Sequence, residues 1–165
     1  MISDRIVKQL LAADDAAGEN RKPVAPNEAK AVDHTTRPVL MERAAYLKQM
    51  ARASEGSASE ILREYPRHNI QLSVRLRGGV AELHERFADV FFVLDGRAML
   101  VTGGRIVKPL STGVGEVRGT MIEGGDRQEL RTGDVAHIAA GTPHQILLTG
   151  DETFTAMVIK VQEID

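Results

Sequence analysis

Histidine and carboxylate side chains near two separate turns are of the residue types that bind a metal ion. Glu82, His84 and Asp89 lie within one stretch, and His144 follows a Gly-Thr-Pro turn about sixty residues later. Imidazole and carboxylate donors suit Mn, Fe, Co, Ni or Zn better than Ca or Mg. Two carboxylates balance the charge of one divalent ion. Four such donors leave coordination positions open for a substrate or dioxygen.

The surrounding sequence explains how these side chains could meet. Residues two apart on a strand point to the same face, so Glu82 and His84 share a face with Arg86. Asp89 precedes the apolar run 90–94, where a carboxylate is costly unless it is hydrogen-bonded, ion-paired or bound to metal. An ion pair of Glu82 with Arg75 or Arg86 is the alternative to a metal role.

A two-residue period begins at Asn69, where apolar Ile70, Leu72 and Val74 alternate with polar side chains. Gly- and Asp-containing turns separate the short strands that we expect after it. These strands are 80–84, 90–94, 98–102, 105–107, 127–130, 135–138, 145–148 and 154–161. Many short strands at even spacing predict an all-β sandwich or barrel.

The sequence before Asn69 has a different character. We expect residues 1–40 to form an N-terminal arm, with a short helix near 6–11, and residues 41–165 to form the barrel domain. Helical spacing of Leu40, Ala44, Leu47 and Ala51 predicts a helix at about 40–53. A further helical turn is expected at Ser59–Glu64. The glycine-rich stretch Lys108–Gly125 is longer than a hairpin loop and is interpreted either as a lid or rim or as a plain surface insertion.

Two motifs in this order resemble those of the cupin superfamily. The spacing from Asp89 to Gly96 matches the acid-to-glycine spacing of the first cupin motif, and counting back places His84 and Glu82 at its two histidine positions. Gly133 and His144 match the ends of the second motif, with Ala139 in place of its proline and no evident terminal asparagine. The resemblance covers roughly residues 69–161.

The resemblance implies a double-stranded β-helix jelly-roll barrel of the small, single-domain RmlC-like type. It also implies one divalent transition metal (Mn, Fe, Ni, Co or Zn) held by Glu82, His84, Asp89 and His144. Glu82 replaces a histidine and Asp89 a glutamate, so the ligand set is unusually acidic for the family. Oxygenase, isomerase or decarboxylase chemistry on a small polar molecule is implied, with the catalytic residues unassigned. A non-catalytic module that binds a small ligand is the alternative.

Three further residues are candidates for the wall of a substrate pocket. Arg86 could bind an anionic substrate or form a rim salt bridge. Phe91 is a candidate for core or pocket wall. His137 lies in an expected strand, on the side away from the proposed ligands, where a structural or pocket-wall role is expected.

Composition narrows the function classes. The chain has 165 residues and a net charge of −2, which argues against a nucleic-acid partner. It has no cysteine, so thiolate metal sites and disulfides are excluded. It also has no apolar run long enough to span a membrane, and a cytoplasmic location is the default expectation. Exposed sheet edges and the arm favour a homodimer.

Overall fold

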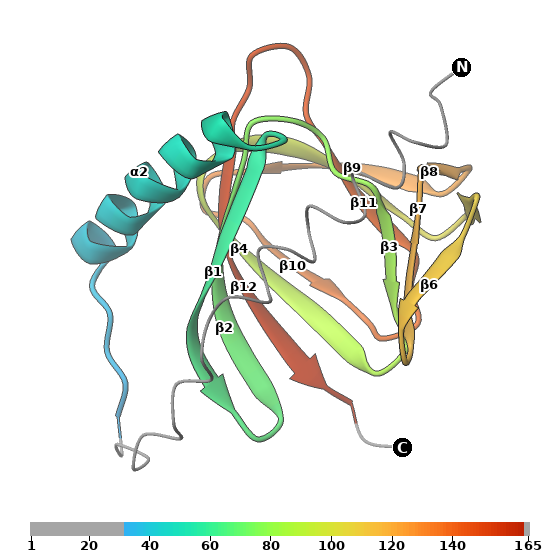
Figure 1. Ribbon diagram of the computed structural model, residues 1–165, viewed down its shortest axis with the longest axis horizontal. Helices are drawn as coiled ribbons and strands as arrows, with labels where there is room; N and C mark the ends of the chain where they lie inside the picture. The colour runs from blue at the N-terminus through green and yellow to red at the C-terminus, as the bar shows by residue number, and fades with distance from the viewer. Residues whose placement is uncertain (1–31, 164–165) are drawn as a thin grey trace.

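The computed structural model describes residues 32–163, and within them the chain is mostly β-strand with one helix (Figure 1). The helix is α2 (Arg37–Ala53). The strands are β1 (Ser57–Tyr65), β2 (His68–Arg75), β3 (Ala81–His84), β4 (Phe87–Thr102), β5 (Arg105–Val107), β6 (Leu110–Gly113), β7 (Glu116–Gly119), β8 (Met121–Glu123), β9 (Asp126–Arg131), β10 (Val135–Ile138), β11 (His144–Leu147) and β12 (Phe154–Gln162). The all-β fold class expected from the sequence is confirmed.

The strands form one curled antiparallel sheet in the order β1-β2-β12-β4-β11-β3-β7-β6. Strand β4 joins the two halves of this sheet. Its first part pairs with β12 and β10, and its second part pairs with β11 and β9. A separate two-stranded sheet consists of β5 and β8. The curl brings the two ends of β4 into opposite walls of a barrel (Figure 1).

The barrel is filled by apolar side chains from its facing strands. Phe154, Leu130 and Ala156 are almost completely buried in the main cluster, to which Phe91 also belongs. A second cluster includes Ala81 and packs near β5 and β8. These side chains exclude water from most of the interior, so a polar group inside it requires a partner.

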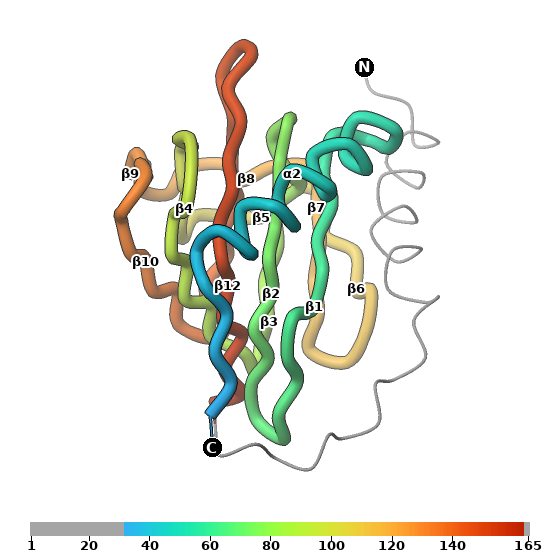
Figure 2. The backbone as a smooth tube through the Cα atoms, turned by 90° about the vertical axis from the view of Figure 1, so that its left-hand side faces the viewer, coloured from blue at the N-terminus to red at the C-terminus, as the bar shows by residue number. Residues whose placement is uncertain are grey.

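Helix α2 confirms the helix expected at about 40–53, although it begins at Arg37, inside the stretch assigned to the arm. Pro38 occupies the first turn, where its missing N–H costs nothing. The four residues expected on the apolar face are the buried ones: Leu40, Ala44, Leu47 and Ala51. Helix α2 lies over the outer side of β1 and β2 in Figure 2, and Ala44 and Leu47 pack there in one cluster with the fully buried Leu72 and Val74.

The further helical turn expected at Ser59–Glu64 is wrong, because these residues belong to strand β1. Strand β1 pairs with β2 through a tight turn, with Tyr65 opposite His68. Ala58 and Leu62 pack against the cluster beneath α2. Burial of one strand face under the helix therefore outweighs the local helix propensity of this segment.

The two strands expected at 90–94 and 98–102 are parts of one long strand, β4. The expected turn at Asp95-Gly96 is instead a bend within it. Opposite Thr155 and Ala156 the register skips Leu94, which marks a β-bulge. Gly96 has a φ of 81°, and a Cβ there would lie 1.9 Å from the Thr153 carbonyl oxygen. Glycine permits the bend that turns β4 from one wall to the other.

The stretch Lys108–Gly125, interpreted as a lid or rim or as a plain surface insertion, contains β6, β7 and β8. Strand β7 pairs with β3 over its whole length and places Glu116 opposite His84. The segment therefore forms part of the barrel wall beside the candidate site. Its many glycines hid this role, since strands with few β-branched residues give a weak sequence signal.

The arm and its expected helix near 6–11 lie, except for residues 32–40, outside the described residues. Within the part of the chain that the structure describes, no helix is long and apolar enough to cross a membrane.

Candidate metal centre

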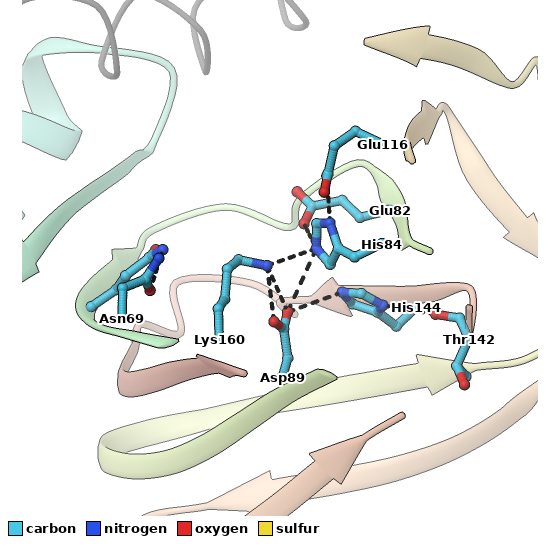
Figure 3. Close-up of polar contacts among 9 residues, drawn as sticks. Asn69, Glu82, His84, Asp89, Glu116, Thr142, His144 and Lys160 are labelled. Carbon is cyan, nitrogen blue, oxygen red and sulfur yellow. Dashed lines mark hydrogen bonds and ion pairs between the residues drawn. The ribbon is translucent and has the colours of Figure 1, made fainter. Parts of the chain in front are cut away.

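Three strands, β3, β4 and β11, bring the candidate ligands to one place inside the barrel (Figure 3). Glu82 and His84 lie two apart on β3 and share a face, as expected. His144 begins β11 and is the register partner of Glu82. Asp89 enters from the first part of β4, on the opposite wall. The turn before His144 is tied to β3, because the Gly141 N–H donates to the His84 carbonyl oxygen over 2.7 Å.

The distances suit a shared ion. Glu82, His84 and His144 each offer one ligand atom, and these atoms all lie within 4.8 Å of one another. Asp89 Oδ2 is 3.6 Å from His84 Nε2 and 3.6 Å from His144 Nε2. Two donors at about 2.1 Å from one metal at a tetrahedral angle stand about 3.4 Å apart. The donor set therefore fits a divalent ion, with Asp89 beside the three-residue group.

Both imidazoles turn a lone pair toward this shared space. His144 Nδ1 lies 3.0 Å from the Thr142 carbonyl oxygen, which only accepts, so Nδ1 carries the proton. His84 Nδ1 lies 2.5 Å from Glu116 Oε2 and donates to it in the same way. In each ring Nε2 is left as the acceptor. A carboxylate or carbonyl behind a metal-binding histidine fixes its tautomer and orientation.

The charge of the site favours a cation. Burial raises the pKa of Glu82, but the His84 imidazole 3.6 Å away and the nearby Arg75 guanidinium outweigh burial and lower it well below its usual range. Burial lowers the pKa of His144, and the Glu82 carboxylate opposes this effect without reversing it. His144 is therefore a neutral donor beside an ionised carboxylate.

His84 lies where the negative charges converge. Burial lowers its pKa, the neighbouring Glu116 and Glu82 carboxylates raise it, and the Lys160 ammonium lowers it again. The same carboxylates stabilise any positive charge placed among them.

Lys160 supplies such a charge, and sequence reasoning missed it. Its ammonium donates to His84 Nε2 over 2.8 Å and to the two Asp89 oxygens over 2.9 and 3.1 Å. A cationic His84 would repel this ammonium, so the imidazole accepts and Lys160 carries the charge. The signal was present: Lys160 has the same strand parity as the buried Ala156 and Val158, and so points inward. The ion pair with Lys160 also explains how the buried Asp89 is tolerated.

Glu116 was also missed, for a different reason. It lies on β7, inside the stretch expected to be a lid or rim or a surface insertion, so no strand parity was assigned to it. Its carboxylate reaches His84 because β7 pairs with β3 at that position.

The three residues proposed for the pocket wall lie apart from this group of contacts. Arg86 is exposed at the turn between β3 and β4. Phe91 is buried in the main core cluster. His137 is exposed on β10, opposite Val90, while Ile138 is buried. Their role in substrate binding stays a prediction.

Comparison of the sequence with models of known protein families and with curated proteins finds no match. Solved structures with similar folds do exist. The protein TT1209 of Thermus thermophilus has a TM-score of 0.50 and 20% identity, covering 70% of this chain and 93% of its own. The protein BH2720 of Bacillus halodurans has a TM-score of 0.57 and 14% identity, with coverages of 86% and 89%. A cupin superfamily protein of Desulfitobacterium hafniense is also similar, with a TM-score of 0.47, 17% identity and coverages of 67% and 81%.

The curled antiparallel sheet, with its two motifs on paired strands, agrees with the likeness to TT1209 and BH2720. The chain has a cupin-type fold. At identities of 20% and below, the likeness concerns the fold alone. In this cupin-type barrel, Glu82, His84 and His144 form a group positioned for a metal.

Proposed function

We propose that this chain is a metal-dependent cupin that acts on a small polar molecule. One observation carries the proposal: two buried imidazoles, each with its proton fixed on Nδ1, direct Nε2 toward a space shared with a carboxylate. Glu82, His84 and His144 would hold a divalent transition metal, with Asp89 as a fourth group. The reaction class stays open among oxygenase, isomerase and decarboxylase chemistry.

The residues of the site have separable tasks in this proposal. A bound ion would polarise a carbonyl or hydroxyl group of the ligand or activate dioxygen. Glu82 and Asp89 supply negative charge, and the two imidazoles supply neutral donors. Glu116 holds the His84 ring in position. Burial of His84, Asp89 and His144 strengthens the electrostatic contacts that they make.

Metal analysis tests the proposal directly. Protein purified without added metal, or challenged with Co²⁺, Mn²⁺ or Zn²⁺ after chelation, is expected to hold close to one ion per chain. Removing a residue that only hydrogen-bonds to a metal ligand typically lowers metal affinity 10–100-fold. Removing a ligand itself, in His84→Ala or His144→Ala, is therefore expected to lower metal affinity at least about 100-fold. His68→Ala is the control, because His68 is exposed at the β1–β2 turn. Wild-type protein that binds none of these ions would overturn the proposal.

A non-catalytic module for a small ligand is the second candidate, and Lys160 favours it. With this ammonium on Asp89, the site already contains a cation without any metal. A module of this kind is stabilised by its ligand but does not convert it. If the two histidine variants lose metal and yet keep a ligand-induced rise in melting temperature, without turnover in any form of the protein, this second function is supported.

A further inference from the structure

The ammonium of Lys160 contacts the same atoms that a metal would use (Figure 3). His84 Nε2 has one lone pair in the ring plane, and Lys160 donates to it over 2.8 Å. Asp89, whose side chain is 4% exposed, receives the same ammonium on both carboxylate oxygens. A metal on His84 Nε2 and this Lys160 contact therefore exclude each other.

The backbone fixes this arrangement. Lys160 lies on β12 and is the register partner of Asp89 on β4, so the two side chains leave adjacent strands side by side. Strand β12 also pairs with β2 on its other side, so it is held along both edges. The lysine side chain is 23% exposed, unlike a lysine that reaches freely into solvent. Its position is a property of the barrel wall.

The charges around the donors are already balanced when Lys160 is in place. Three carboxylates lie in this region: Glu82, Asp89 and Glu116. Three side-chain cations act on them: Lys160, and the Arg75 and Arg118 guanidinium groups near Glu82. With both imidazoles neutral, a divalent ion added to this set would leave two positive charges in excess at low dielectric. Moving the ammonium away removes part of that excess.

We propose that Lys160 is an internal counter-cation that competes with the divalent metal for His84 Nε2 and the Asp89 carboxylate. Metal binding requires its ammonium to leave these atoms, and the apo site is held together by the ammonium until then. This inference rests on the proposed metal site and adds a residue that determines how tightly the site binds its metal.

The first test compares metal affinity in Lys160→Met, Lys160→Arg and wild-type protein. Chelator-treated protein is titrated with Co²⁺, whose visible absorption reports coordination, and isothermal calorimetry gives the affinity. Because repulsion between ammonium and metal is removed, Lys160→Met is expected to bind Co²⁺ about tenfold or more tightly than wild type. Lys160→Arg keeps the positive charge and is expected to stay close to wild type or weaker. Lys48→Met on α2 makes the same chemical change away from the candidate ligands and is expected to change nothing.

The outcomes separate this inference from the proposed function. If neither wild type nor Lys160→Met binds any Co²⁺, the proposed metal site itself is wrong. If both bind with equal affinity, or if Lys160→Met binds more weakly, the metal site stands and the competition is overturned.

A second measurement uses only wild-type protein, because Lys160→Met leaves Asp89 buried without its ammonium and could prevent folding. Acetic anhydride labels lysines, and mass spectrometry of peptides compares Lys160 with Lys48 as an internal reference. Adding Co²⁺ is expected to raise the labelling of Lys160 relative to Lys48 severalfold, as the ammonium is released. Unchanged relative labelling at saturating Co²⁺ would contradict the displacement.

Discussion

Each imidazole of the candidate site has its orientation determined by an acceptor behind it. For His144 the acceptor is the Thr142 carbonyl oxygen, two residues away in the same turn. For His84 it is Glu116, a residue from another strand whose side chain is 33% exposed. A backbone acceptor cannot be removed by substitution, whereas Glu116 can be changed without disturbing the core. Substitution of Glu116 therefore tests how the orientation and basicity of the His84 ring affect metal binding.

We expect Glu116→Gln to weaken Co²⁺ binding about tenfold while leaving the melting temperature of the apo protein nearly unchanged. The amide keeps an acceptor for His84 Nδ1 but loses the negative charge that makes the ring a stronger donor. Calorimetric titration with Co²⁺ gives the affinity, and Glu129→Gln, an exposed change on β9, is the control. Equal affinity in Glu116→Gln and wild type would show that Glu116 does not support the site.

The sequence sufficed to select the ligand candidates but not the groups around them. Glu82, His84 and His144 carry donor side chains next to turns, so residue type and spacing were informative. Lys160 was hidden because a lysine near the end of a strand normally extends into solvent. Its inward direction follows from strand parity, but its place beside Asp89 depends on the register of β12 against β4, which is a long-range property. Glu116 depends in turn on the pairing of β7 with β3.

At the scale of elements, the bend in β4 allows both walls of the barrel to share one strand. The part before Gly96 carries Asp89, and the part after it pairs with the strand that carries His144. The bend therefore sets the angle at which the donors face each other. It needs a residue with positive φ and no side chain next to Thr153.

Gly96→Ala is expected to lower the free energy of unfolding by about 2–4 kcal/mol, from strained backbone and the clash with the Thr153 carbonyl. Gly124→Ala is the matched control, because Gly124 has a φ of 73° but nothing within 4 Å of an added Cβ. It is expected to cost only the backbone strain, about 1 kcal/mol. Urea unfolding followed by circular dichroism measures both. Equal losses in the two variants would contradict the role of close packing at Gly96.

Helices and strands with a regular apolar spacing were predictable from the sequence. Strands whose conformation depends on the segments packed against them were not. The helix α2 and strand β2 present regular apolar faces, and both were expected from spacing alone. Strand β1 contains good helix formers such as Leu62 and Glu64, so local propensity pointed the wrong way until burial beneath α2 decided the outcome. The single strand β4 was divided in the prediction because Asp-Gly pairs usually mark hairpins.

At the scale of the whole molecule, four strands of the main sheet have an unpaired edge among the described residues. Strands β1, β6, β9 and β10 each have a sheet neighbour on one side only. Unpaired edges favour association with another chain unless they are covered. We propose that the protein is a homodimer and that the N-terminal arm takes part in the contact.

Mass in solution checks this proposal. Light scattering of the full chain is expected to give about twice 18.0 kDa, and removal of residues 1–36, which precede α2, is expected to shift the mass toward the monomer. Metal affinity serves as the control that the truncated barrel is intact. A monomeric full chain would contradict the dimer, and a dimer that persists after truncation would remove the arm from the contact.

The position of β12 between β2 and β4 has a consequence for the growing chain on the ribosome. Chain synthesis proceeds from the N-terminus at about 5–20 residues per second. All four candidate ligands therefore emerge before Lys160, and β2 and β4 stay unjoined until β12 arrives between them. For a brief interval a nascent chain exposes its donors without the internal ammonium. A metal ion present during translation would then meet these donors before the competing ammonium does.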